Sequence, residues 1–330
     1  MDKGAIMQTS FGSSMLAAAA SDAARATHAT AAAGKLPGRK VTGPILLATD
    51  LSARCDRALD RAVLLARQFG VPLLVVHVLS PPHSLSLGAP VPVDNNQLKE
   101  QAEARLLRDL ENMVDGVQVA LRVYTGDPAA RLRQVAEEEH CALIVTGVAR
   151  DDALGLGLGR SLLGTTVERL VRETSRPVLV VKRRARAPYQ DAVIATDFSA
   201  ASRWALDAAL TLLPSASLTL FHAFELPRGP LRDTSPDAET AKGFQRMAEE
   251  SAADFVNATP ALDGRPPPRF QVAAGRAERV ALDYVRQTQA SLLVAGTHGA
   301  SGLSGALLGS VAEAFLERAP CDVLVVRQPR

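Results

Sequence analysis

The sequence contains few cysteines, and none of them is spaced for a bridge or a metal. Cys55, Cys141 and Cys321 are the only three in 330 residues, and they lie far apart with no CxxC pair. This spacing argues against a disulfide framework and a zinc knuckle, and it favours a reducing compartment. We therefore expect a cytoplasmic protein in which the cysteines pack as small apolar side chains.

The chain also lacks an excess of either charge and a long apolar run. It carries 37 basic and 35 acidic residues, so a net charge of +2 gives no electrostatic reason to bind nucleic acid or a membrane. No stretch approaches the roughly 18 consecutive apolar residues of a membrane span. We expect neither nucleic acid nor membrane among the partners.

Residues arranged for catalysis or metal binding are absent as well. There is no Gly-Lys-Ser/Thr of a Walker loop, and the nearest approach, Gly159 to Gly164-Thr165, lacks the lysine. No His, Asp and Glu positions have metal-ligand spacing, and no Ser, His and Asp form a set with motif support. The sequence therefore predicts no catalytic residue and no metal site.

Residues 1–41 differ from the rest of the chain. They are rich in alanine, with scattered Ser, Thr and Gly, and they lack the basic start and long apolar centre of a secretory signal. We predict a mostly disordered tail. A transit peptide is the alternative, but Arg is sparse and Asp2 and Asp22 are present.

After the tail the sequence repeats itself. Residues 49–63 align without gaps with residues 196–210, and eight of the fifteen pairs are identical. The ends of the repeats match too, since RPVLVVK answers CDVLVVR. We infer a duplicated unit of about 145 residues, with domains at 42–186 and 187–330.

Strand and helix patterns alternate within each unit. Short continuous apolar runs predict strands that are covered on both faces. In the first unit these are Ile45–Ala48, Leu73–Val78, Val117–Val123, Leu143–Thr146 and Val178–Val181. Helical patterns lie between them, at 59–69, 96–114, 127–139 and 165–174. The order predicts an α/β fold with two doubly wound parallel sheets, in which ligands bind beyond the carboxyl ends of the strands.

A glycine-rich turn follows the fourth strand of the second unit. The stretch AGTHGASGLSGALLGSVAE places Gly296 and Gly299 directly after the strand, and Gly309-Ser310 directly before a helix. Glycine permits positive φ and close approach of N–H groups to an anion, and a helix N-terminus attracts negative charge. The turn is therefore predicted to hold phosphate.

This combination of residues resembles the ATP-binding signature of the universal stress protein family. The resemblance rests on Gly296-x2-Gly299-x9-Gly309-Ser310 together with Asp197, and it covers about residues 43–328. It implies five-stranded sheets of order 3-2-1-4-5 and an adenine-nucleotide site that takes ATP, with or without magnesium. The implied site residues are Asp197, Ala223, Gly296, Gly299, Gly309, Ser310 and Val311. His298 is a further candidate, because it lies between two glycines of the loop.

The first unit departs from this signature. It keeps Asp50, Val78, Gly147, Gly164 and Thr165. Arg150 replaces the second glycine, four extra residues lengthen the loop, and Asp151 and Asp152 bring negative charge towards the phosphate position. We expect this site to be degenerate, although Arg150 could instead pair with phosphate.

Several of these residues also have a purely structural interpretation. Asp50 and Asp197 suit a turn or helix cap, and Ser310-x-x-Glu313 and Thr165-x-x-Glu168 match capping boxes. His77 and His222 are predicted to be core histidines with satisfied hydrogen bonds, whereas His298 could contact phosphate or face water. The run KRRAR at 182–186 is predicted to be a solvated linker.

These features favour a non-catalytic stress-response protein that binds ATP in its second unit. A slow ATPase and a nucleotide-free interaction module are the alternatives. The family resemblance also implies pairing through the last strand, which Val178–Val181 and Val323–Val326 could form within one chain as a pseudo-dimer. A homo-oligomer is compatible with the sequence.

Overall fold

The first unit contains every strand and helix that the sequence predicts. The computed structural model describes residues 6–7, 40–53, 55–80, 95–110, 116–148, 164–226, 238–262, 265–298 and 308–328. The strands are β2 (Ile45–Thr49), β3 (Leu73–Leu79), β4 (Val119–Thr125), β5 (Leu143–Gly147) and β6 (Val178–Val181). The helices are α2 (Asp56–Phe69), α3 (Asn95–Leu110), α4 (Pro128–Glu138) and α5 (Gly164–Glu173).

The second unit repeats this order of elements. Its strands are β7 (Asp191–Thr196), β8 (Ser217–Phe224), β9 (Arg269–Ala274), β10 (Leu292–Gly296) and β11 (Asp322–Val326). Its helices are α6 (Ala200–Leu212), α7 (Ala238–Asn257), α8 (Ala277–Thr288) and α9 (Ser310–Arg318), with a 3-10 turn at Pro260–Leu262.

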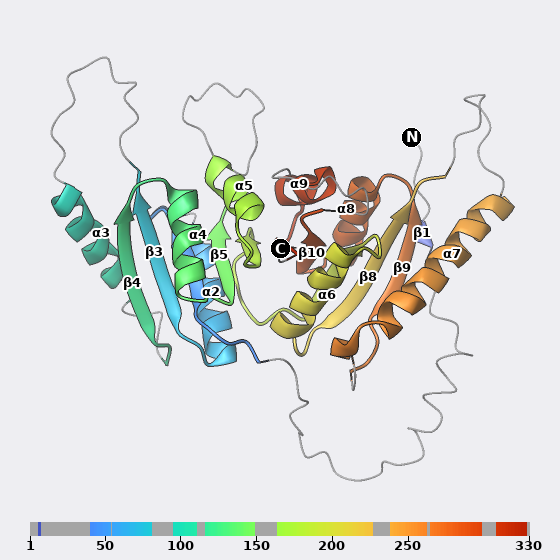
Figure 1. The fold of residues 1–330 in the computed structure, drawn as a ribbon, viewed down its shortest axis with the longest axis horizontal. Helices are drawn as coiled ribbons and strands as arrows, with labels where there is room; N and C mark the ends of the chain where they lie inside the picture. The colour runs from blue at the N-terminus through green and yellow to red at the C-terminus, as the bar shows by residue number, and fades with distance from the viewer. Residues whose placement is uncertain are drawn as a thin grey trace, which may run out of the picture.

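All strands lie in one continuous sheet (Figure 1). Its order is β1-β9-β8-β7-β10-β11-β6-β5-β2-β3-β4, so each unit has the predicted order 3-2-1-4-5 with parallel neighbours. The sequence predicts two tandem five-stranded sheets. They are joined because β6 and β11 pair antiparallel, with Leu179 opposite Leu324, as predicted for the pseudo-dimer.

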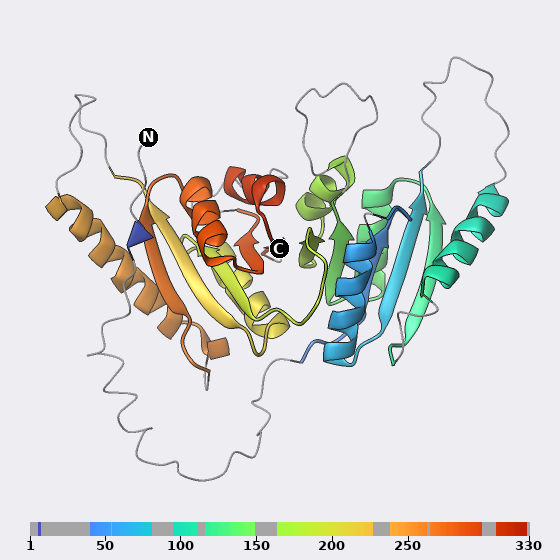
Figure 2. The same ribbon diagram turned by 180° about the vertical axis from the view of Figure 1, so that it is seen from behind.

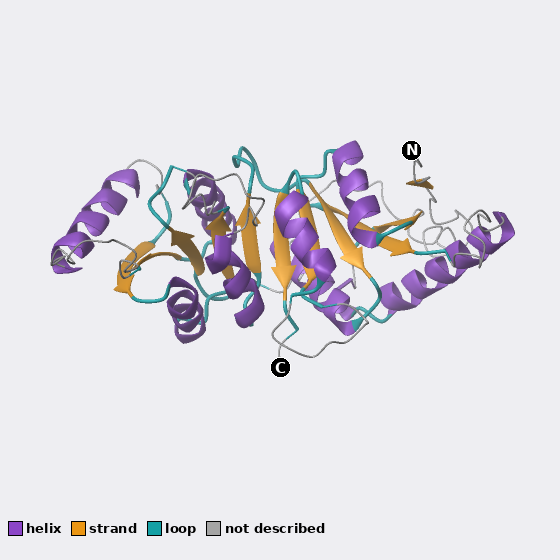
Figure 3. Cartoon of the chain, turned by 90° about the horizontal axis from the view of Figure 1, so that it is seen from above, coloured by secondary structure: helices purple, strands orange, loops and turns teal. Residues whose placement is uncertain are grey.

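Helices cover both faces of the sheet, as the continuous apolar strands require. Helices α2, α3, α6 and α7 share one core, and α4, α5, α8 and α9 share the other. Along β2, Ile45 and Leu47 face the first core, whereas Leu46 and Ala48 face the second. Helices α4 and α6 lie on opposite faces of the sheet, yet Figure 1 shows α4 in front of the first unit and α6 in front of the second. The reason is that the twist of the strands accumulates across the sheet. Figure 2 shows the reverse, and Figure 3 shows helices on both sides along its length.

A short strand lies within the segment expected to be a disordered tail. β1 (Ile6–Met7) pairs antiparallel with Val272 and Ala273 at the outer edge of β9. An edge strand presents unpaired backbone groups, and this pairing satisfies part of that edge.

A buried carboxylate joins the two units. Asp322 is fully buried, and its Oδ1 accepts hydrogen bonds from the backbone N–H groups of Lys182, at 2.8 Å, and Arg183, at 2.9 Å. Its Oδ2 accepts a hydrogen bond from the hydroxyl of Tyr189, at 2.6 Å, and lies 3.6 Å from the guanidinium of Arg61. Burial raises the pKa of Tyr189 well above 10, so this hydroxyl stays a donor.

Cations after the last strand of each unit bind the last helix of the other unit. Lys182 Nζ donates to the carbonyls of Phe315, at 3.4 Å, and Ala319, at 3.0 Å, and the guanidinium of Arg327 donates to the carbonyl of Arg172. Carbonyls at a helix C-terminus lack intrahelical donors, so the contacts to Ala319 and Arg172 satisfy backbone groups across the junction, whereas the carbonyl of Phe315 also accepts from the backbone N–H of Ala319. The linker prediction is thus wrong for Lys182, whose pKa burial lowers to about 8.

Candidate functional site

Asp197 closes the first strand of the second unit and organises the turn into α6. Its Oδ1 accepts hydrogen bonds from the backbone N–H of Ser199, at 3.0 Å, and from the hydroxyl of Ser202, at 2.6 Å. Phe198, which lies between Asp197 and Ser199, has a φ of 62°, in the left-handed region. Ser199, whose hydroxyl accepts from the backbone N–H of Ser202, is the N-cap of α6. The turn role predicted for Asp197 is confirmed, while the cap role belongs to Ser199.

The first unit has the same turn with a thiol in place of the hydroxyl. Asp50 Oδ1 accepts from the backbone N–H of Ser52, at 2.8 Å, and from Cys55 Sγ, at 3.0 Å. Burial raises the pKa of Asp50, but hydrogen bonds from Ser52 and Cys55 outweigh it, and the net pKa is lowered. All three cysteines are unpaired, as predicted, but Cys55 binds a carboxylate where pure apolar packing was expected.

Sequence analysis missed this donor to the aspartate in both units. Ser202 aligns with Cys55 in the duplication, five residues after the aspartate in each case. The sequence offered one signal for this contact: a hydroxyl in one unit and a thiol in the other stand at the same spacing from the aspartate, and both groups can donate to a carboxylate.

Glycine allows close packing at both ends of the turn. A Cβ on Gly296 would lie 3.1 Å from the backbone of Ala201 at the start of α6, and a Cβ on Gly309 would lie 3.1 Å from the carbonyl oxygen of Thr297. Gly309 has φ of −64°, so at this position the predicted need for positive φ is wrong, while the predicted close approach of an anion stays a prediction.

Helix α9 begins one residue earlier than the capping box predicts. Gly309 is the N-cap, its N–H donates to the carbonyl of Thr297 at 2.9 Å, and its carbonyl accepts from Glu313 at 3.0 Å. Ser310 is therefore the first helical residue and is exposed, so the capping-box prediction is wrong for Ser310. The amides of Ser310, Val311 and the next residue have no acceptor within the helix, at the positive end of its dipole.

His298 places a buried nitrogen without a partner near this helix start. Its Nδ1 lies 2.9 Å from the hydroxyl of Thr297. Its Nε2 is buried and has no hydrogen-bond partner among the residues that the structure describes. A buried polar atom without a partner is uncommon in native proteins, and a bound ligand is one explanation for it.

The strand-two histidines are satisfied core residues, as predicted. His77 Nδ1 lies 2.8 Å from the carbonyl of Thr49, and His222 Nδ1 lies 2.9 Å from the carbonyl of Thr196. Burial lowers the pKa of His222. Each histidine therefore ties strand two to the end of strand one, and the next residues, Val78 and Ala223, continue their strands towards the carboxyl edge.

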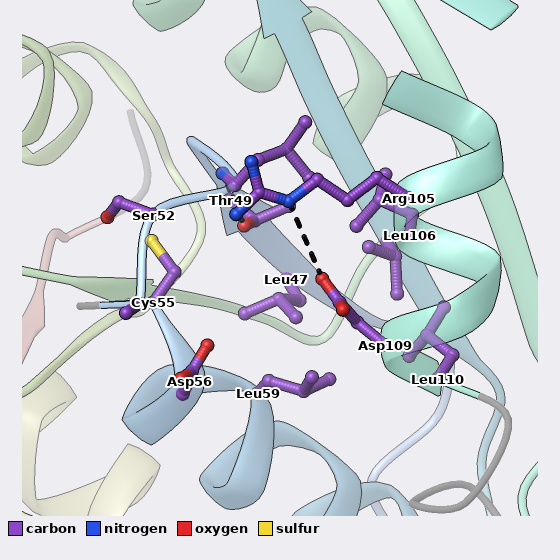
Figure 4. A pocket seen from close by; sticks show the side chains of 13 residues that line it. Leu47, Thr49, Ser52, Cys55, Asp56, Leu59, Arg105, Leu106, Asp109 and Leu110 are labelled. Atoms are coloured by element: carbon purple, nitrogen blue, oxygen red, sulfur yellow. Dashed lines mark hydrogen bonds and ion pairs between the residues drawn. The ribbon is translucent and has the colours of Figure 1, made fainter. Parts of the chain in front are cut away.

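The two units differ in the space behind the aspartate turn. In the second unit Phe198 stacks on His222, with centroids 4.5 Å apart, and meets the edge of Phe255 at 5.8 Å. In the first unit Leu51 stands at the position of Phe198, and a cavity of about 160 Å³ remains between α2 and α3. Figure 4 shows this cavity, with the ion pair of Arg105 and Asp109 at one wall.

The remaining predicted residues either lie outside the described residues or stand at the ends of β5 and α5. Gly299, Arg150, Asp151 and Asp152 lie outside the described residues. Gly147 ends β5, while Gly164 and Thr165 begin α5. Among the described residues no group of His, Cys, Asp and Glu is arranged for a metal ion, and no described helix is long and apolar enough to span a membrane.

Comparisons with known proteins agree on one family. The model of the universal stress protein family matches residues 42–182 and 188–327. A universal stress protein of Mycolicibacterium smegmatis is 26% identical over 298 residues, covering 86% of this chain and 96% of that protein.

A solved structure that covers most of the chain shows the same fold. A universal stress protein from Archaeoglobus fulgidus, at 20% identity, covers 87% of this chain and 96% of its own, with a TM-score of 0.61. A structure of the universal stress protein from Archaeoglobus fulgidus in complex with dAMP covers 43% of this chain and 99% of its own, at 21% identity and a TM-score of 0.32.

Proposed function

We propose a function for a chain that belongs to the universal stress protein family: it binds ATP in its second unit and acts in the stress response without catalysis. In this proposal the bound nucleotide changes the surface that the protein presents to partners. The boundary between the two units lies in the linker, at residues 186 and 187.

The start of α9 is the observation that carries the proposal. Gly309 packs the helix start closely against Thr297, where an added Cβ would lie 3.1 Å from a carbonyl oxygen, and the following amides have no acceptor within the helix. The Nε2 of His298, which has no hydrogen-bond partner among the described residues, adds a donor or acceptor at the same turn. An anion at this place would accept from these amides.

The residues present fit an adenine nucleotide in distinct roles. We assign the phosphates to His298, to Gly309 and to the amides of Ser310 and Val311. We assign the nucleoside to Asp197 and to the backbone of Ala223, with Gly296 and Gly299 leaving room beside it. Any magnesium would be bound through the phosphates, because the described residues offer no cluster of metal ligands.

We propose that the first unit does not bind ATP. Its loop carries Arg150 where the second unit has Gly299, is four residues longer, and contains two further carboxylates, Asp151 and Asp152. Two carboxylates beside a polyphosphate repel it, and one arginine does not offset both of them.

Paired substitutions of the two aspartates test this assignment. Asp197→Ala is expected to weaken ATP binding by about 10- to 100-fold, because one charge-assisted hydrogen bond contributes about 1.5–3 kcal/mol. Asp50→Ala, the matched control, removes the same turn contacts in the first unit and is expected to leave affinity and stoichiometry unchanged. Isothermal titration calorimetry measures both, and thermal unfolding checks that each variant folds.

Two results would overturn the proposal. If Asp50→Ala loses ATP binding and Asp197→Ala retains it, the site lies in the first unit. If the unaltered protein does not bind ATP, the alternative of a nucleotide-free interaction module is favoured. ATP turnover above ~0.1 per second that is lost in Asp197→Ala would make the protein an enzyme.

A further inference from the structure

The helix after the first strand of each unit borders a groove at the junction, and in the first unit the linker fills it. Arg57 donates to the carbonyl of Lys182, at 2.8 Å, and Arg61 donates to the carbonyl of Ala187, at 2.9 Å. The guanidinium of Arg61 also lies 3.8 Å from the ring centre of Tyr189. Two arginines of α2 therefore hold the linker in this groove.

The duplicated helix α6 has lost both arginines. In the gap-free alignment Trp204 stands at the position of Arg57, and Ala208 stands at the position of Arg61. The long side chain that fills the first groove is thus replaced by a methyl group in the second.

A cavity of about 260 Å³ results between α6 and the amino ends of the first-unit strands. Its apolar lining includes Val41, Pro177, Ala208, Leu212 and Val326. Trp204 forms part of the wall and remains 39% exposed, although large aromatic side chains are usually covered. The cavity is therefore lined by a partly exposed aromatic side chain together with apolar residues.

The charges around this cavity favour an anion. Lys40 and Arg327 both line it, and the hydrogen bond from Arg327 to the carbonyl of Arg172 holds that guanidinium in place. Asp207 is the one carboxylate among the lining residues, and both Asp207 and Arg327 have a further interaction partner within the chain. The lining thus carries two positive groups and one negative group.

We propose that this cavity binds a small planar aromatic carboxylate, with its ring against Trp204 and its carboxylate between Lys40 and Arg327. Aromatic rings stack on indole, and a carboxylate leaving water requires charged or hydrogen-bonding partners. Both units contribute residues, so the site exists only where the two are joined in one chain. It is separate from the nucleotide site and does not depend on it.

Because the chain has a single tryptophan, NMR spectroscopy can test the proposal on one indole N–H signal. Trp204 is the only tryptophan, so a 15N-labelled sample gives one indole N–H signal. Three probes with the same aromatic body but different charge are compared: 2-naphthoate, 2-naphthalenemethanol and 2-naphthylmethylammonium. We expect 2-naphthoate to shift the indole signal saturably, the alcohol to bind at least about fivefold more weakly, and the amine to bind weakest.

Variants locate the site. Ala208→Arg, which restores the side chain of the first groove, is expected to abolish the shift. Lys40→Glu is expected to weaken 2-naphthoate binding at least about fivefold. If Ala208→Arg does not fold, the result for Lys40→Glu alone tests whether the cavity is the binding site. Lys99→Glu, on the exposed side of α3, is the control for the same charge change and is expected to have no effect. Asp197→Ala is expected to retain 2-naphthoate binding.

The proposal is overturned by equal or tighter binding of the amine, or by Lys40→Glu that binds like the unaltered protein. It is also overturned if the indole signal shows no saturable shift up to ~10 mM 2-naphthoate.

Discussion

Replacing Asp322 by alanine is expected to lower the free energy of unfolding by about 3–5 kcal/mol, the cost of leaving a buried charge network without one partner. The carboxylate is fully buried and accepts from two backbone amides and from Tyr189. Its removal leaves those donors without their acceptor and the guanidinium of Arg61 without its ion pair at the junction. Chemical denaturation monitored by circular dichroism measures the change.

Asp127→Ala is the matched control for this substitution. Asp127 is the N-cap of α4, accepts from the amide of Ala130 at 2.8 Å, and has a side chain that is 45% exposed. Loss of an exposed cap lowers stability by about 1 kcal/mol. If Asp322→Ala costs no more than Asp127→Ala, the buried network does not hold the units together.

Gly309→Ala is expected to weaken ATP binding about tenfold or more, which corresponds to at least ~1.4 kcal/mol. The added methyl would lie 3.1 Å from the carbonyl oxygen of Thr297, so the start of α9 must move away from β10. That movement displaces the amides of Ser310 and Val311 that we assign to the phosphates. Isothermal titration calorimetry with ATP measures the change.

Gly243→Ala provides a control within the same unit. Gly243 lies inside α7, and an added methyl there meets nothing within 4 Å. This substitution is expected to leave ATP affinity unchanged and to raise stability by about 0.5–1 kcal/mol, because alanine loses less backbone entropy in a helix. Equal ATP affinity in Gly309→Ala and Gly243→Ala would refute the role of the α9 start.

Local sequence patterns predicted the elements of this fold well. The continuous apolar runs correctly located the five strands of the first unit, and four of them are buried on both faces, whereas the edge strand β4 is mostly half-buried or exposed. The strand order came from the family resemblance, and the pairing of β6 with β11 was predicted from the same source. The buried role of Asp322 was not foreseen, since its partners Arg61 and Tyr189 are distant in sequence.

The details of the candidate site were less predictable. The capping box around Ser310 was a local pattern, but tertiary contact of Gly309 with Thr297 starts the helix one residue earlier. Asp197 was singled out correctly as a turn residue, yet its bond to Ser202 depends on the fold of the turn. The cavity beside Trp204 arises from side chains of both units, so no single segment of sequence predicts it.

A crystal structure of the full chain grown with excess ATP tests the central claim most directly. We predict phosphate density at the amides of Ser310 and Val311 and adenine near Ala223, with no nucleotide at the start of α5. Nucleotide bound at the start of α5, or an α9 start with its amides unoccupied under the same conditions, would contradict the account.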